Sequence, residues 1–213
     1  KPLLAVGGPA SLANMINPLG VGIVTRLLAS IGPETVAGFG IASRLEGLSI
    51  VVMLAMSAAV GPVVGQNYGA GEHDRVDESM GYCFRLAFIW SSGTAIFLAA
   101  VGPFITPLFD PSFEVQRVAN MYLWMVPITY FGYGWNIVQS AAFNALGRPV
   151  LANVMTVGRV FVAYVPAALV LSVGFGFGTA GIFGGAMIGN VVGGVAAWLG
   201  RRWMRRALAD RRR

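Results

Sequence analysis

The chain has 213 residues, of which 56% are hydrophobic and only 11% are charged. Soluble domains carry about 25% charged residues, so this composition excludes an ordinary soluble domain and indicates a polytopic α-helical membrane protein. The net charge of +6 does not indicate nucleic-acid binding, because seven of the fifteen basic residues lie between Arg201 and Arg213 and no basic stripe alternates with stacking aromatic residues.

Six apolar segments are long enough to cross a bilayer as helices. About 20 helical residues cross a hydrocarbon core of roughly 30 Å, and short connections rich in Gly and Pro separate the segments. We therefore expect an all-α fold, with a six-helix transmembrane unit over residues 1–200 and a basic cytoplasmic tail over residues 201–213. The predicted spans are residues 3–31, 34–64, 79–102, 118–146, 149–171 and 179–199.

The distribution of basic residues between the two ends of these spans predicts their orientation. One end carries Lys1, Arg75, Arg148 and the C-terminal arginines, whereas the connections at the other end carry three acids. Basic residues accumulate on the cytoplasmic side of membrane proteins. We therefore expect both ends of this multi-pass chain at the cytoplasmic face of the plasma (inner) membrane, with the tail beside anionic lipid headgroups of the bilayer.

The first span contains a proline, Pro18, close to two asparagines. A proline inside a helix removes one backbone hydrogen bond, here the one that the carbonyl of Asn14 would accept. Asn14 and Asn17 lie three residues apart and therefore share a helix face. The pattern predicts either a kinked, polar site that lines a cavity, or an ordinary kink whose asparagines bond to neighbouring helices.

The second span carries two charges in its interior and breaks, we expect, at Gly61-Pro62. Arg44 and Glu46 are two residues apart, so they point in different directions and cannot pair on the helix. An ionisable group inside a bilayer is costly unless it faces a cavity or a partner. For Glu46 we favour a functional role, and for Arg44 a structural one; ion pairs with other helices, or snorkelling of Arg44, are the alternatives.

The fourth span has the most polar interior. Its polar side chains recur every three or four residues and are joined by aromatic surface, which suits amphiphilic and also cationic ligands. The alternative is hydrogen bonding between helices together with aromatic packing in the core. The stripe consists of Tyr133, Asn136, Ser140 and Asn144, with Gln139 beside it, and the residues of this span that we predict to line a cavity are Tyr133, Asn136, Gln139, Ser140 and Phe143.

The last two spans carry features to which we assign structural roles. Arg159 lies near the middle of the fifth span, and we expect it to pair or to snorkel without taking part in chemistry. Small residues at four-residue intervals are typical of helices that pack closely in membranes. The sixth span shows this pattern at Gly181, Gly185, Gly189 and Gly193.

Residues for enzyme chemistry are sparse. The single cysteine, Cys83, and the single histidine, His73, form no disulfide framework or paired metal site within the chain. Neither H-E-x-x-H nor G-x-S-x-G occurs, so we expect no enzyme activity and no cofactor. The start at Lys1-Pro2 has no initiator Met and no signal-peptide pattern, which leads us to expect a fragment of a longer protein.

Three segments resemble the multidrug and toxic compound extrusion (MATE) family. They are FGIASRLE at Phe39–Glu46, GPVVGQNYGAG at Gly61–Gly71 and ALGRP at Ala145–Pro149. The resemblance covers nearly the whole chain and matches the C-terminal half of the family. It implies one lobe of a twelve-helix exporter, with an N-terminal six-helix lobe as its partner. Such exporters exchange sodium ions or protons for organic cations and other amphiphiles by alternating access.

The family's acidic positions differ in this chain. Some relatives carry a cation-binding carboxylate on the first helix of this lobe and a second acid on the fourth helix. The resemblance implies that Asn17 stands at the position of the first acid and Asn136 at the position of the second. Gln139 matches the family's residue at its position. An amide cannot take up a proton, although the oxygens of Asn17 and Asn136 can ligate sodium. Glu46 is the acid left in the interior of a span, so coupling falls to Glu46 or to acids on the other lobe.

Two other readings stay open. A flippase for lipid-linked oligosaccharides or polysaccharides shares the helical plan and would favour a basic cavity, for which Arg44 and Arg159 are the available residues. A membrane scaffold without transport activity is favoured by the glycine pattern and opposed by the polar stripe of the fourth span.

Overall fold

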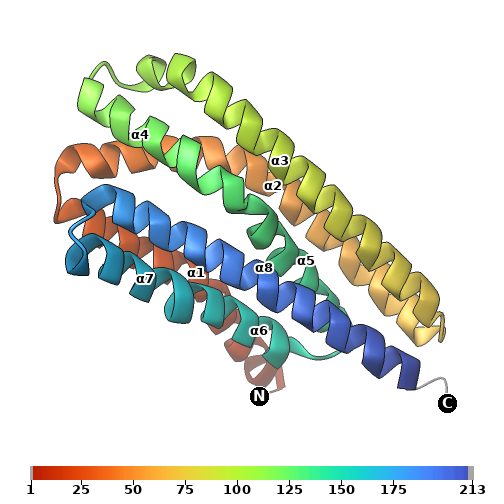
Figure 1. Cartoon of the computed structure of the whole chain (residues 1–213). Coiled ribbons are helices and arrows are strands. Elements are labelled where there is room, and N and C mark those ends of the chain that lie inside the picture. The colour runs from red at the N-terminus through yellow and green to blue at the C-terminus, as the bar shows by residue number, and fades with distance from the viewer. Residues whose placement is uncertain (1, 211–213) are drawn as a thin grey trace.

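The computed structural model describes the backbone of residues 2–210 and the side chains of residues 15–207. Six helical rods, joined by short turns, run antiparallel in one elongated bundle (Figure 1). This confirms the predicted all-α, six-helix fold. The rods are α1 Pro2–Ala29; α2 Pro33–Gly69; α3 His73–Phe109; α4 Phe113–Met125 with the 3-10 turn η1 Val126–Thr129 and α5 Tyr130–Ala145; α6 Pro149–Val157 with the π-helix η2 Gly158–Tyr164, α7 Val165–Leu169 and the π-helix η3 Val170–Gly174; and α8 Gly178–Asp210.

The helices continue past prolines at which we expected them to break or end. Pro62 lies inside α2, which runs on to Gly69. A proline removes one backbone hydrogen bond, and the bonds of the neighbouring turns remain. Val60 and Val64, on either side of this position, are both buried in the bundle and hold the helix in place. The expected break at Gly61-Pro62 is therefore wrong, and α3 likewise passes through Pro103 and Pro107.

Four of the described helices are long and apolar enough to cross a membrane. They are Pro33–Gly69, His73–Phe109, Pro149–Gly174 and Gly178–Ala207, while Met15–Ala29 is apolar but shorter. The fourth rod differs because η1, which contains Pro127, divides it into two shorter helices. The two parts of this rod, α4 and α5, continue in the same general direction and pack beside α2 and α8 (Figure 1).

The fifth rod departs from α-helical geometry around Arg159. Pro166 has no N–H to offer to the carbonyl four residues before it, so the hydrogen-bond register must shift there. The π-helix η2 ends at Tyr164, two residues before this proline, and contains Arg159. Single π turns of this kind are frequent at functional sites.

The glycines of α8 let this helix lie directly against the fifth rod. A Cβ added at Gly185 would be 2.5 Å from the backbone nitrogen of Ala168, and one at Gly193 would be 2.7 Å from Cδ of Arg159. On the other side of α8, a Cβ at Gly132 of α5 would be 2.1 Å from the carbonyl oxygen of Asn190. The glycine pattern thus serves close packing, and it also makes room for the Arg159 side chain.

Candidate functional site

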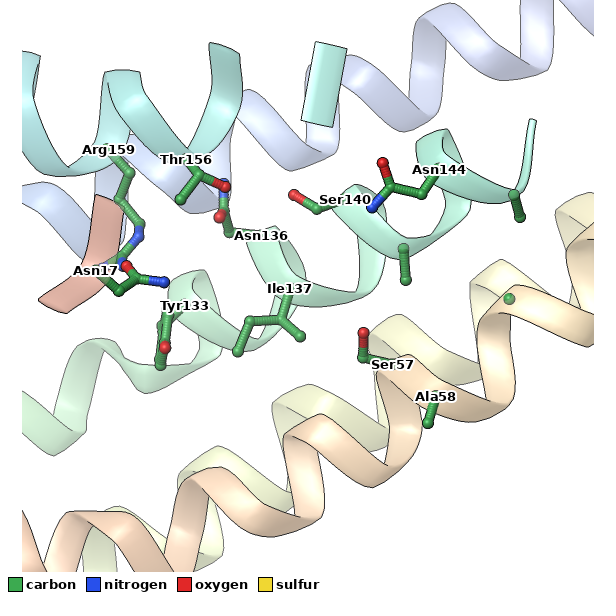
Figure 2. A pocket seen from close by; sticks show the side chains of 13 residues that line it. Asn17, Ser57, Ala58, Tyr133, Asn136, Ile137, Ser140, Asn144, Thr156 and Arg159 are labelled. Atoms are coloured by element: carbon green, nitrogen blue, oxygen red, sulfur yellow. The ribbon is translucent and has the colours of Figure 1, made fainter. Parts of the chain in front are cut away.

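One cavity of the bundle, which we call the larger cavity, has a volume of about 570 Å³. Such a volume suits a drug-sized ligand. Figure 2 shows side chains from α1, α2, α5 and the fifth rod around it. The lining residues are Asn17, Ser57, Ala58, Gly61, Tyr133, Asn136, Ile137, Ser140, Ala141, Asn144, Ala145, Thr156 and Arg159.

The polar stripe of α5 supplies one wall of this cavity. Tyr133, Asn136, Ser140 and Asn144 all line it, as their helical spacing predicts. The remaining predicted members of the stripe lie elsewhere.

Gln139 and Phe143 face α8 instead of the cavity. Gln139 is fully buried, and a Cβ added at Gly200 would lie 3.4 Å from its Cγ. Phe143 packs edge to face against Trp203, with ring centroids 6.2 Å apart. The reason is helix geometry, since residues three positions after Asn136 and Ser140 are rotated toward the neighbouring helix. The structure therefore does not place these two predicted residues at the cavity.

Arg159 is the centre of the polar contacts. Its side chain is only 8% exposed. The guanidinium donates hydrogen bonds of 2.8 Å to Oδ1 of Asn17 and 3.3 Å to Oδ1 of Asn190, and it lies 4.4 Å from the ring centre of Tyr133. Asn190 in turn donates to the hydroxyl of Thr129 at 3.1 Å. Residues from α1, α5 and α8 thus meet at the guanidinium of Arg159, and η1 is joined to it through Asn190.

Sequence reasoning gave Arg159 a structural role and named it for a basic cavity only under the flippase alternative. We expected pairing or snorkelling, and the partners are two asparagines and a tyrosine ring within the bundle. Two signals in the sequence pointed toward this arrangement. They are Pro166, which shifts the helix register behind Arg159, and Gly193, which leaves space for its side chain.

Glu46 lines a second, smaller cavity of about 270 Å³. The Tyr122 hydroxyl donates a hydrogen bond of 2.6 Å to Oε2 of Glu46, so α4 supplies the partner of this α2 side chain. Asn17, Tyr133 and Arg159 line both cavities and form the wall between them. Glu46 therefore faces the inside of the bundle, with the guanidinium of Arg159 at the same cavity.

Arg44 lies on the exposed face of α2. Among the described residues it has no hydrogen-bond or ion-pair partner, so its structural role stays a prediction. The side chain of Asn14 lies outside the described residues. Of the two α1 asparagines predicted to line a cavity, Asn17 is described and lines the larger cavity.

The possible sodium site at Asn17 and Asn136 also stays a prediction. Both residues line the larger cavity, and Asn136 is only 2% exposed. Oδ1 of Asn17 accepts a hydrogen bond from Arg159, and a cation at this oxygen would be repelled by the guanidinium. Among the described residues, no group of three or more His, Cys, Asp or Glu side chains is placed to hold a metal ion.

Comparison with known proteins assigns the family. A sequence profile described as MatE matches residues 9–170. The chain belongs to the MatE family. Members of this family are multi-pass membrane transporters rather than enzymes, and the resemblance stated from the three sequence segments is confirmed.

Relatives of the MatE family match nearly the whole chain. A protein named FAD transporter, from Shewanella oneidensis, is 29% identical over 196 residues, which are 92% of this chain and 43% of the relative. A probable multidrug resistance protein NorM from Thermotoga maritima is 25% identical over all of this chain and 47% of the relative. The chain therefore spans less than half the length of these relatives.

Solved structures of the family share the fold. The MATE transporter VcmN of Vibrio cholerae, in its bent form, superposes with a TM-score of 0.89 at 29% identity, over 97% of this chain and 47% of that protein. An inward-facing multidrug resistance transporter of the family matches with a TM-score of 0.86 at 26% identity, over 98% of this chain and 48% of that one. The six rods thus correspond to about half of such a transporter.

Proposed function

We propose that this chain forms one lobe of a secondary transporter that exports organic amphiphiles across the inner membrane by alternating access, driven by sodium ions or protons moving inward. Family membership supports the proposal, as do relatives named as multidrug resistance proteins and as an FAD transporter. Those relatives are about twice as long, so a second six-helix lobe would face this one and complete the substrate cavity.

The observation that carries the proposal is the pair of adjoining cavities. A drug-sized cavity and a smaller one lined by the Glu46 carboxylate meet at Arg159. Both lie between helices of a bundle in which four are long and apolar enough to cross a membrane. Ionisable groups at this depth are typical of substrate and ion pathways. In the proposal, the larger cavity accepts the substrate and Glu46 accepts the coupling ion.

The test replaces Glu46 by glutamine in the complete transporter that contains this chain. The variant is reconstituted into vesicles, and an imposed sodium or proton gradient drives the export of a fluorescent substrate. Glu46→Gln should lose most of this export. The amide keeps the shape of the side chain and cannot take up a proton. Separate sodium and proton gradients applied to the wild type identify the coupling ion.

The matched control is Glu34→Gln, the same change at an exposed position in the first turn of α2. We expect the control to export like the wild type. Wild-type export and ion dependence in Glu46→Gln would remove Glu46 from the mechanism. A wild-type protein that moves no substrate under either gradient would favour the scaffold reading.

A flippase for lipid-linked saccharides is the second candidate. The position of Arg159 in the larger cavity favours it, because a guanidinium binds phosphate and pyrophosphate headgroups well. Transfer of a fluorescent lipid-linked pyrophosphate between leaflets of reconstituted vesicles, in the absence of solute export, would select this candidate.

A further inference from the structure

We propose that the larger cavity binds an anionic group, a carboxylate or a phosphate carried by a drug-sized amphiphilic solute. The binding residues are Arg159, Asn136 and Ser140, which we call the donor cluster. This inference rests on the proposed export function and names the class of substrate that the lobe accepts.

Each residue of the donor cluster has one buried donor atom that no described residue pairs with. Nε of Arg159, Nδ2 of Asn136 and the hydroxyl of Ser140 are all buried, and none of these atoms has a hydrogen-bond partner among the described residues. All three residues line the same cavity (Figure 2). Buried donors that stay unpaired are costly, so a rotation of these side chains toward a ligand with acceptor oxygens recovers free energy.

The charge of the cavity also selects an anion. No described residue that lines the larger cavity is acidic, and Arg159 forms none of the ion pairs found among the described residues. Its described hydrogen-bond partners are neutral amides. Glu46 lines the smaller cavity, where its carboxylate accepts the Tyr122 hydroxyl. A guanidinium in this position prefers a carboxylate or phosphate, which it can hold through two parallel hydrogen bonds.

The guanidinium is held in place before any ligand arrives. Asn17 of α1 and Asn190 of α8 accept hydrogen bonds from two of its nitrogens, and the Tyr133 ring covers one face. The side chain lies against Gly193, where any Cβ would displace it. A preorganised donor binds more tightly because little conformational entropy is lost on binding.

The rest of the cavity wall is apolar. Ala58, Ile137 and Ala141 line it on the side of α2 and α5. Ligand sites of this volume combine such apolar surface with a few well-placed polar groups. The geometry therefore suits an amphiphile whose apolar body lies along α5 and whose acidic group reaches Arg159.

The experiment compares two probes that differ by one phosphate group, riboflavin and riboflavin 5′-phosphate. Binding of each to the complete transporter in phosphatidylcholine nanodiscs is followed by flavin fluorescence. We expect the wild type to bind the phosphorylated probe at least roughly tenfold more tightly, as one charge-assisted hydrogen bond suggests. Arg159→Gln should abolish this preference and leave riboflavin binding in place.

Further variants keep the test decisive. Arg85→Gln, the same change at an exposed position of α3, should retain the full preference. Ser140→Ala removes one donor with little change in volume and should weaken binding of the phosphorylated probe alone. It serves as the test if Arg159→Gln does not fold. Equal binding of both probes by the wild type, or a preference that survives both substitutions, overturns the proposal.

Two further measurements distinguish a solute site from a lipid site, and the anion site from the coupling role of Glu46. Nanodiscs that contain phosphatidylglycerol should leave the preference intact; its loss there would mean that a lipid headgroup takes the site, which overturns the assignment to a solute. Glu46→Gln should retain the preference while losing gradient-driven export. The anion site and the coupling role of Glu46 can therefore fail independently of each other.

Discussion

At the scale of single residues, the bundle keeps two charges at membrane depth by different means. Burying a charge costs several kcal/mol unless partners compensate for the lost water. Arg159 is compensated by two amides and an aromatic ring, and Glu46 by a tyrosine hydroxyl. Both charges also border a cavity. Neither Arg159 nor Glu46 forms an ion pair with a described residue, so each charge remains available to a ligand or ion.

The contact between Tyr122 and Glu46 gives a prediction at this scale. Tyr122→Phe removes the hydroxyl that donates to the carboxylate at 2.6 Å and should lower the free energy of unfolding by about 1–3 kcal/mol. Thermal unfolding of the purified protein in detergent measures the change. Tyr82→Phe is the control, since Tyr82 is 63% exposed. Equal melting of the two variants would show that the buried contact contributes little.

At the scale of elements, the fifth rod and α8 act as one unit. The glycines of α8 bring the two backbones together, and η2 places Arg159 at the point where α8 carries Gly193 and Asn190. The close contact between α8 and the fifth rod therefore explains both the packing role of the glycines and the position of Arg159.

The close approach of these elements predicts the effect of adding a single methyl group. Gly185→Ala would place a Cβ 2.5 Å from the backbone of Ala168, so the helices must separate, at a cost of roughly 1–3 kcal/mol. Gly93→Ala on α3 meets no atom within 4 Å and should stabilise the helix by up to about 1 kcal/mol. Melting temperatures that move in opposite directions would confirm the packing role; a stabilised Gly185→Ala would contradict it.

At the scale of the whole molecule, the six antiparallel rods bring the start of α1 and the end of α8 to the same end of the bundle (Figure 1). That end also holds the turn between α2 and α3 and the connection before α6. Its arginines predict that it faces the cytoplasm. The chain is a multi-pass membrane protein by family, and the side on which its ends lie stays a prediction.

Cysteine labelling from outside the cell tests this orientation. In a background with Cys83→Ala, Ser30→Cys lies at the turn between α1 and α2, and Ala70→Cys lies at the turn between α2 and α3; both positions are exposed. A thiol reagent that cannot cross the membrane should label the first in intact cells and the second only after permeabilisation. The reverse pattern would invert the proposed topology.

Local properties of the chain were enough to predict the all-α fold, the six helices and the cavity-lining face of α5. Hydropathy and the 3.6-residue period depend on neighbours along the chain, so Tyr133, Asn136, Ser140 and Asn144 could be assigned to one face before any partner was known. The close packing at the α8 glycines was predictable for the same reason.

Which helix each face meets was decided by the tertiary structure alone. Periodicity does not say that Gln139 and Phe143 face α8, that Tyr122 reaches Glu46 across 76 positions, or that Asn17 meets Arg159 across 142. Pro62 also stays within α2 because packing of the surrounding residues offsets the lost hydrogen bond. Composition thus determined that polar groups lie inside the bundle, and packing determined which of them meet, because contacts between distant segments depend on how the rods are arranged.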